Sequence, residues 1–173
     1  MALNYQALPI EVESVSNVTA TNSVDLGTVR VYNGEEYVYV YNAGPQSITV
    51  GQCAFMSANS GFSVTVTATV DGGDFPIGFV KHTAIGTGAY GWLITRGFTS
   101  VQNGMTSTAI TIGDLLIPAA AGAVRKQPAV GLGTSLSQTT VFFAPYIGTV
   151  VSGCASGGTG SSVGVAYVRC FGS

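Results

Sequence analysis

A strand–turn–strand signal near residue 33 constrains the fold more than any other feature of the chain. Residues 29–32 read Val-Arg-Val-Tyr, Asn33 and Gly34 follow, and residues 36–41 alternate strictly in side-chain type. Asn-Gly is the strongest short cue for a two-residue hairpin, because the central positions of that turn need positive φ. The block therefore predicts two antiparallel strands joined by a tight turn.

The alternation gives the second of these strands two distinct faces. Tyr37, Tyr39 and Tyr41 point to one side, and Val38 and Val40 to the other, because successive side chains of a strand alternate. A row of tyrosines either stacks against a sugar or forms a sheet face that packs on a partner strand or subunit. We expect the packed face, which is the commoner use, and keep the sugar platform as the alternative.

The rest of the chain repeats strand and turn signals and has no amphipathic pattern of helical length. Glycine accounts for 24 of 173 residues, about twice the usual share. Strand-like segments lie at residues 48–50, 53–56, 63–70, 79–80, 92–94, 108–112, 139–144, 146–151 and 163–171, with a strand–turn–strand unit at 115–124. These signals predict an all-β fold, a single antiparallel β-sandwich or β-barrel domain.

Residues 1–24 are predicted to form an extended N-terminal arm, and residues 25–173 the single β-domain. Tyr5, Leu8 and Ile10 make a short apolar segment, broken by a proline that discourages helix, and little periodicity follows it. Such an arm is either a frayed terminus or a strap onto a neighbouring chain. The strap hypothesis predicts that residues 1–10 contact another chain.

Two sequence motifs that often mark nucleotide-binding or catalytic sites lack the neighbouring residues that those sites require. Residues 86–91 match the dinucleotide pattern G-x-G-x-x-G, but a strand-like run follows where a helix is needed. Residues 160–164 match the nucleophile elbow G-x-S-x-G, but no acid or histidine comes after them. His82 is the only histidine, with Asp71 or Asp74 as its nearest acidic candidates and no serine singled out. We therefore predict a protein that is not an enzyme and has no cofactor; a hydrolase using His82 is the alternative.

Charged side chains are scarce, and the cysteines are not spaced for a metal. The chain has six basic and eight acidic residues, 8% in total, where about 25% is typical. This favours equally a subunit packed against others and a plain Ser/Thr-rich β-protein. A pI near 5.1 argues against nucleic acid as a partner. Cys53, Cys154 and Cys170 are expected to be thiols, with a Cys154–Cys170 bridge as the alternative, and no zinc site is expected. No apolar run reaches the roughly 18 residues of a membrane span.

Several short stretches are similar to the head decoration, or capsid cement, proteins of tailed bacteriophages. The stretches are residues 25–28 (DLGT), 33–40 (NGEEYVYV), 89–92 (AYGW), 96–97 (RG) and 115–123, in an order that covers about residues 25–125. The resemblance implies a structural virion protein that binds the outside of the capsid and clamps neighbouring capsomers. It also implies a homo-oligomer, with a trimer as the expected form, and no catalytic residues.

The partners expected on this basis are the major capsid protein and further copies of the chain, without nucleic acid or membrane. The location is the capsid surface, after synthesis in the host cytoplasm. The candidate contact residues are Tyr5, Leu8, Ile10, Tyr37, Tyr39, Trp92 and Arg96. Trp92 is expected to be at least half buried, in the core or at an oligomer contact. The alternative function is a receptor- or glycan-binding virion module, such as a fibre or tail domain, with the tyrosine row and Trp92 as its platform.

Overall fold

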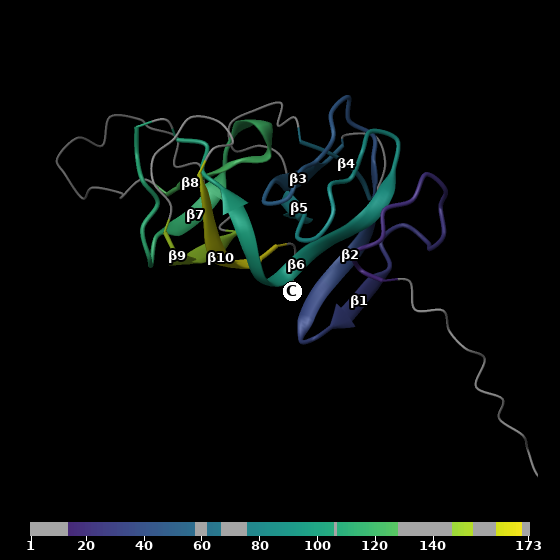
Figure 1. Ribbon diagram of the computed structural model, residues 1–173, viewed down its shortest axis with the longest axis horizontal. Coiled ribbons are helices and arrows are strands. Elements are labelled where there is room, and N and C mark those ends of the chain that lie inside the picture. Colours follow the sequence, from purple (N-terminus) through teal and green to yellow (C-terminus); the bar gives the residue numbers. More distant parts are fainter. Residues whose placement is uncertain are drawn as a thin grey trace, which may run out of the picture.

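The computed structural model describes residues 14–57, 62–66, 76–105, 107–127, 147–153 and 162–170 (Figure 1). Within these residues the regular structure consists of ten strands and one 3₁₀ turn, so the all-β prediction is confirmed. The strands are β1 (Val29–Tyr32), β2 (Glu35–Asn42), β3 (Cys53–Met56), β4 (Ser63–Thr65), β5 (Pro76–Phe79), β6 (Tyr90–Gln102), β7 (Leu115–Pro118), β8 (Val124–Lys126), β9 (Gly148–Ser152) and β10 (Val163–Arg169). The 3₁₀ turn, η1, spans Ala120–Gly122.

Five of the strands close into a barrel. β2, β4, β3, β5 and β6 are neighbours in that order, and β2 also pairs with β6, which completes the ring. All of these pairs are antiparallel except that of β2 with β4, which is parallel. Aliphatic side chains fill the barrel interior: Val38, Val40, Ile48, Ala54, Val64, Val66, Ile77, Val80, Ile85 and Leu93.

The β1–β2 hairpin forms where the sequence predicted it. Asn33 and Gly34 have φ values of 52° and 78°, as a type I′ turn requires. β1 pairs with β2 on one side and is the first strand in the sheet order, so its other side is an edge. Alternate residues of β2 enter two different core clusters, and both faces of this strand are therefore covered.

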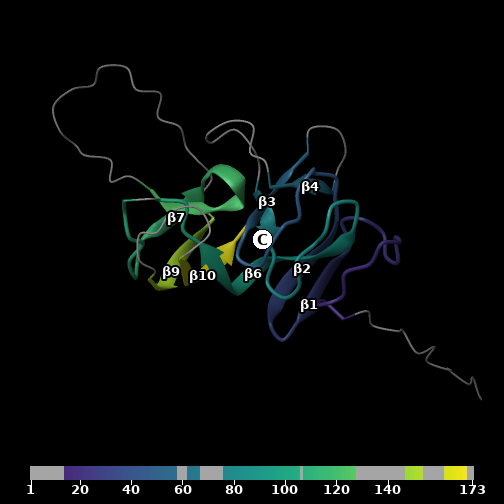
Figure 2. The ribbon, with the colours of Figure 1, turned by 45° about the horizontal axis from the view of Figure 1, so that its top comes forward.

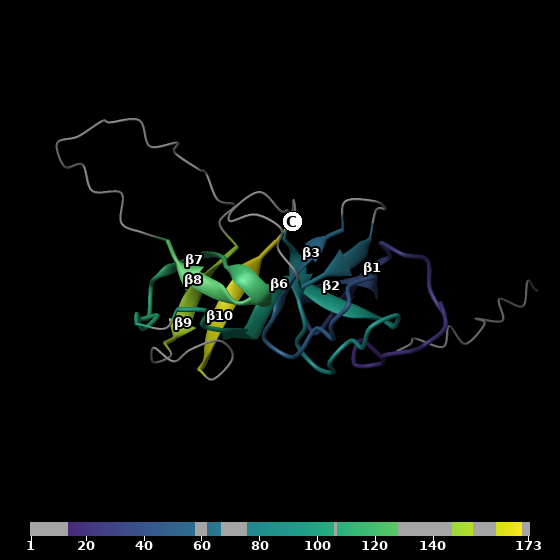
Figure 3. The ribbon, with the colours of Figure 1, turned by 90° about the horizontal axis from the view of Figure 1, so that it is seen from above.

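β6 belongs to the barrel and to a second sheet. Its first half pairs with β2 and β5, and its second half pairs with β10. The strand changes direction between the halves, where the pairing with β2 slips by one residue and Gly97 has φ of 137°. Figure 3 shows β6 between β1–β3 on one side and β7–β10 on the other.

The second sheet continues from β6 through β10, β9, β7 and β8. Just after β6, Asn103 forms a bridge with Val124 of β8, so the far edge of this sheet curls back toward β6 (Figure 2). The strand–turn–strand unit predicted at 115–124 is confirmed, with η1 as its turn. The strand predicted at 108–112 is wrong. There the Asp114 carboxylate accepts the Thr111 backbone N–H at 2.8 Å, which makes a local turn in place of a ladder bond.

A second core cluster fills the space between the barrel and the second sheet. It combines residues of both sheets with Val15 from the N-terminal part of the chain. Residues 14–24 lie against the barrel: Val15 is buried, and Thr19 forms a bridge with Tyr90. The candidate contact residues of the remaining arm lie outside the described residues: Tyr5, Leu8 and Ile10. So do the strand residues predicted at 67–70 and 139–144.

Candidate functional site

Aromatic side chains from β2 and β6 form one cluster on the outside of the barrel. The register sets Tyr39 opposite Trp92 and Tyr41 opposite Tyr90. The ring centroids of Tyr39 and Trp92 are 5.0 Å apart, and those of Tyr41 and Tyr90 are 4.8 Å apart. Such offset, tilted contacts are the geometry that aromatic pairs prefer.

The cluster is covered by the segment that precedes β1 and by Arg30 of β1 itself. The hydroxyls of Thr19 and Ser23 lie 3.3 and 3.0 Å from the Tyr39 hydroxyl. The Arg30 guanidinium lies 4.6 Å from the centroid of the Trp92 ring, a cation–π contact. Trp92 keeps only 4% of its surface exposed, so its predicted burial is confirmed.

Three of the candidate contact residues are thus interior residues of this chain. Tyr37, Tyr39 and Trp92 are all buried in the core cluster shared by the two sheets. The single chain therefore presents no exposed platform at these three positions. Tyr41, the remaining tyrosine of the row, is half-buried. Both faces of β2 are covered, because tyrosine and valine alternate and each is apolar enough to be buried. A contact of these residues with another chain stays a prediction.

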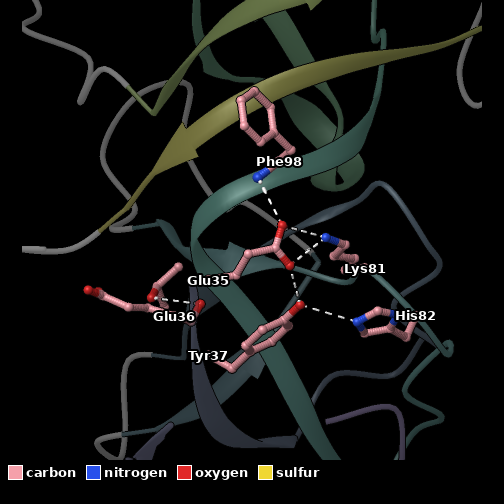
Figure 4. Close-up of polar contacts among 7 residues, drawn as sticks. Glu35, Glu36, Tyr37, Lys81, His82 and Phe98 are labelled. Atoms are coloured by element: carbon pink, nitrogen blue, oxygen red, sulfur yellow. Dashed lines mark hydrogen bonds and ion pairs between the residues drawn. The ribbon is translucent and has the colours of Figure 1, made fainter. Parts of the chain in front are cut away.

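Glu35 lies at the centre of a polar cluster where β2, β6 and the segment after β5 meet (Figure 4). Lys81 Nζ donates to Glu35 Oε1 at 2.6 Å, and the Tyr37 hydroxyl donates to Oε2 at 2.7 Å. The backbone N–H of Phe98 donates to Oε1 at 3.3 Å. Burial alone raises the pKa of Glu35, but the hydrogen bonds from Lys81 and Tyr37 outweigh it and hold the pKa below its ordinary value.

His82 completes this cluster from its exposed side. Its Nε2 lies 3.2 Å from the Tyr37 hydroxyl oxygen, and the two rings are stacked with centroids 5.9 Å apart. Because Tyr37 donates its proton to Glu35, His82 Nε2 must carry the hydrogen in this contact. Burial and the neighbouring Lys81 lower the pKa of His82, against the opposing effect of Glu35.

The hydrogen bonds and pKa shifts in this cluster are those of a structural contact. Burial and the hydrogen bond to Glu35 raise the pKa of Tyr37, which disfavours its phenolate as a base or nucleophile. Glu35 accepts hydrogen bonds at both oxygens and so fixes β2 to β6 beside the bend at Gly97. Asp71 and Asp74, the acids considered as partners for His82, lie outside the described residues.

Among the candidate contact residues that the structure describes, only Arg96 lies on the surface. Its Nη1 donates to Glu36 Oε1 at 3.2 Å, and its Nε donates to the Tyr167 hydroxyl at 3.3 Å. These contacts with Tyr167 and Glu36 raise the pKa of Arg96. Arg96 thus links the barrel to β10 and stands directly opposite Arg169 in the register.

The described residues hold no arrangement suited to a metal or to a helical membrane span. No three of their His, Cys, Asp and Glu side chains are grouped so that a metal ion could bind. Cys53 and Cys170 are buried in the shared core, and burial raises the pKa of both thiols, that of Cys170 to about 12. Cys154 lies outside the described residues. No helix in the described part of the chain is long and apolar enough to cross a membrane.

Sequence reasoning missed an apolar surface on the second sheet, which we call the outer face. The register aligns Phe98, Tyr167, Thr149 and Leu115 in one row across β6, β10, β9 and β7. Val165 and Val163 of β10 lie in the next two rows along the strand, opposite Ser100 and Gln102 of β6, and Val151 of β9 is also exposed. The apolar members of the outer face are Phe98, Leu115, Val151, Val163, Val165 and Tyr167.

The outer face has little charge and one internal aromatic contact. Phe98 and Tyr167 meet edge to face with centroids 5.1 Å apart. Among the described residues of β6, β7, β9 and β10, the only charged residues are Arg96 and Arg169 at one end; β8, at the sheet edge beside β7, adds the half-buried Arg125 and Lys126. The sequence feature that corresponds to this face is the run at 163–168, in which both sets of alternate residues are apolar. Because no polar side chain distinguishes one set from the other, the run does not show which set faces outward.

Comparison with known proteins gives a distant structural likeness. No family model matches the chain, and no curated protein matches it. Among solved structures, the chain is similar to the head fiber gp8.5 N base of bacteriophage phi29. The match has 14% sequence identity and a TM-score of 0.45, and it covers 78% of this chain and 96% of that one.

Proposed function

We propose that this chain is a structural virion protein that binds the outside of a tailed-phage capsid and stabilises it by clamping neighbouring capsomers. The observation that carries the proposal is the outer face, where six apolar side chains stand in adjacent rows on a curved sheet. Monomeric soluble proteins rarely expose contiguous apolar surface of this kind unless it binds a partner. The short motifs shared with capsid cement proteins suggest the partner, a major capsid protein.

The geometry suits adhesion to a repeated surface. The outer face lies on hydrogen-bonded strands backed by the shared core, so it is rigid and loses little conformational entropy when it docks. A shell presents the same site many times, and a homo-oligomer, with a trimer as the expected form, multiplies the contact area. Non-enzymatic action, synthesis in the host cytoplasm and location on the capsid surface belong to the same proposal.

A receptor- or glycan-binding role requires a surface other than the one first expected. Of the platform first expected, Tyr37, Tyr39 and Trp92 are buried within the chain, and Tyr41 is half-buried. The outer face offers one exposed phenylalanine and a half-buried tyrosine, which meet edge to face and do not form a row of parallel rings. The clamp is therefore the function that the described surface supports best.

The test is co-sedimentation of the purified protein with capsids that lack it. Val163→Asp and Val165→Asp place a charge on the outer face at exposed positions, so folding should change little. Each should weaken capsid binding at least tenfold with an unchanged melting temperature. Thr87→Asp, in the exposed turn before β6, is the matched control and should bind like the parent chain. Parental binding by both valine variants would show that the outer face is not the capsid contact.

A further inference from the structure

The β1 strand is an open sheet edge with exposed apolar side chains. Within the described residues it pairs with β2 on one side only, and it ends the strand order of the sheet. Val29 and Val31 are 64% and 66% exposed, far more than any valine of the barrel interior. Native proteins usually protect such an edge with lysine, proline, a bulge or a covering segment. No lysine, proline or covering segment in the described part of the chain protects these valines.

The backbone of β1 is oriented to accept another strand. Across an antiparallel pair, hydrogen-bonded and non-hydrogen-bonded residue pairs alternate. Tyr39 donates its N–H to the Thr28 carbonyl, and the turn residues Asn33 and Gly34 close a two-residue hairpin, so Arg30 and Tyr32 bond to β2. The N–H and C=O groups of Val29 and Val31 therefore point away from β2, toward the open edge.

A segment outside the described residues matches this edge in length and pattern. Residues 10–13 read Ile-Glu-Val-Glu and follow a proline, which is tolerated at the start of a strand. Beside the Val-Arg-Val-Tyr of β1, in either direction, the apolar pair faces Val29 and Val31, and Glu11 falls opposite Arg30. Alternating apolar and opposite-charge cross-strand pairs both stabilise a sheet.

We propose that residues 10–13 of a second copy of the chain add to the β1 edge as an extra strand. Each copy has one such segment and one such edge, so each gives one strand and receives one. Repetition of this contact around a symmetry axis closes a ring without leaving an open edge. The contact joins copies to one another and does not depend on the outer face or on capsid binding.

The first experiment measures self-association by sedimentation velocity over a concentration series, without capsids. Val31→Pro removes the outward N–H of β1 but no bond to β2, and Val31→Ala is the control that keeps this N–H. Deletion of residues 1–13 removes the added strand. The Val31→Pro substitution and the deletion should each weaken association at least tenfold, and combining them should weaken it no further, because they break the same contact.

The second experiment decides whether the strand comes from another copy. The Val31→Pro variant keeps a donor segment, and the deleted chain keeps an acceptor edge, so an equimolar mixture should form a mixed complex that neither forms alone. Absence of that complex, with both single variants weakened, would show that the segment pairs within its own chain and would overturn the proposal.

Two further outcomes would also overturn it. One is a parent chain that stays monomeric at all concentrations, and the other is Val31→Pro associating like the parent. If Val31→Pro does not fold, Glu11→Lys in the full chain tests the same contact, because it places a positive charge opposite Arg30. It should weaken association, and parental association would contradict the proposal.

Discussion

Trp92 is the residue whose removal should cost the fold most. Its ring packs on Tyr39, lies under the Arg30 guanidinium and is almost fully buried. Trp92→Ala removes these contacts and leaves a cavity, so we expect the free energy of unfolding to fall by about 3–5 kcal/mol. Tyr32→Ala truncates an aromatic that is 49% exposed and should change it by no more than about 0.5 kcal/mol. Urea denaturation measures both, and a parental midpoint for Trp92→Ala would place the ring outside the core.

His82 should make stability fall as the pH drops through 6.5 toward the pKa of the folded chain. Its pKa in the folded chain lies below the ordinary value of 6.5, because burial and Lys81 disfavour the imidazolium. As the pH falls through 6.5, the unfolded chain takes up a proton that the folded chain does not, so stability decreases until the pH reaches the folded pKa. His82→Gln keeps a donor for the Tyr37 oxygen but does not titrate. Its melting temperature should therefore fall less over this interval.

Proton NMR of the single histidine checks the same prediction directly. A pKa at or above 6.5 in the folded chain would contradict it. His82→Gln should also bind capsids and self-associate like the parent, because the histidine contacts only structural partners among the described residues. Loss of either property in a folded variant would give His82 a role beyond this cluster.

At the scale of elements, the bend in β6 depends on Gly97. Its φ of 137° is strained for any residue with a side chain, and a Cβ there would lie 2.8 Å from Glu35 Cγ and 3.0 Å from Ile94 Cδ1. Gly97→Ala should lower the free energy of unfolding by about 1–3 kcal/mol. Gly86→Ala is the matched control, because a Cβ at that glycine meets nothing within 4 Å. Equal stability of the two variants in thermal denaturation would show that the bend tolerates a side chain.

Elements set by local signals could be predicted, and those set by distant contacts could not. Asn33 and Gly34 specify their hairpin because the turn geometry depends on those two residues. The full length of β6 was not predicted, because its second half is a strand only by pairing with β10, about seventy residues later in the chain. The strand predicted at 108–112 does not form for the opposite reason: a single nearby side chain, Asp114, competes locally with strand pairing.

The candidate site shows the same division. The burial of Trp92 followed from its size and apolar character, which need no knowledge of the fold. The exposure of Val163 and Val165 could not be predicted in this way. The alternation of side chains along a strand defines two faces, but it does not indicate which face is covered when both are apolar. The contact between Glu35 and Lys81 could not be predicted from the sequence either, because it joins residues on elements that meet only in the folded barrel.

For the whole molecule, we expect the barrel and the second sheet to unfold as one unit. They share β6, and one core cluster contains Phe79 and Ile94 of the barrel together with Leu116 and Val168 of the second sheet. Leu116→Ala removes a fully buried side chain of β7 and should cost about 2–5 kcal/mol. Because the core is shared, this loss should raise amide exchange through global unfolding in β3 and β5 as much as in β9 and β10. Leu115→Ala, at the exposed neighbouring position, is the control and should leave exchange unchanged in both parts. Faster exchange confined to β7–β10 after Leu116→Ala, or a second calorimetric transition, would mean that the two sheets are separate folding units joined only by β6.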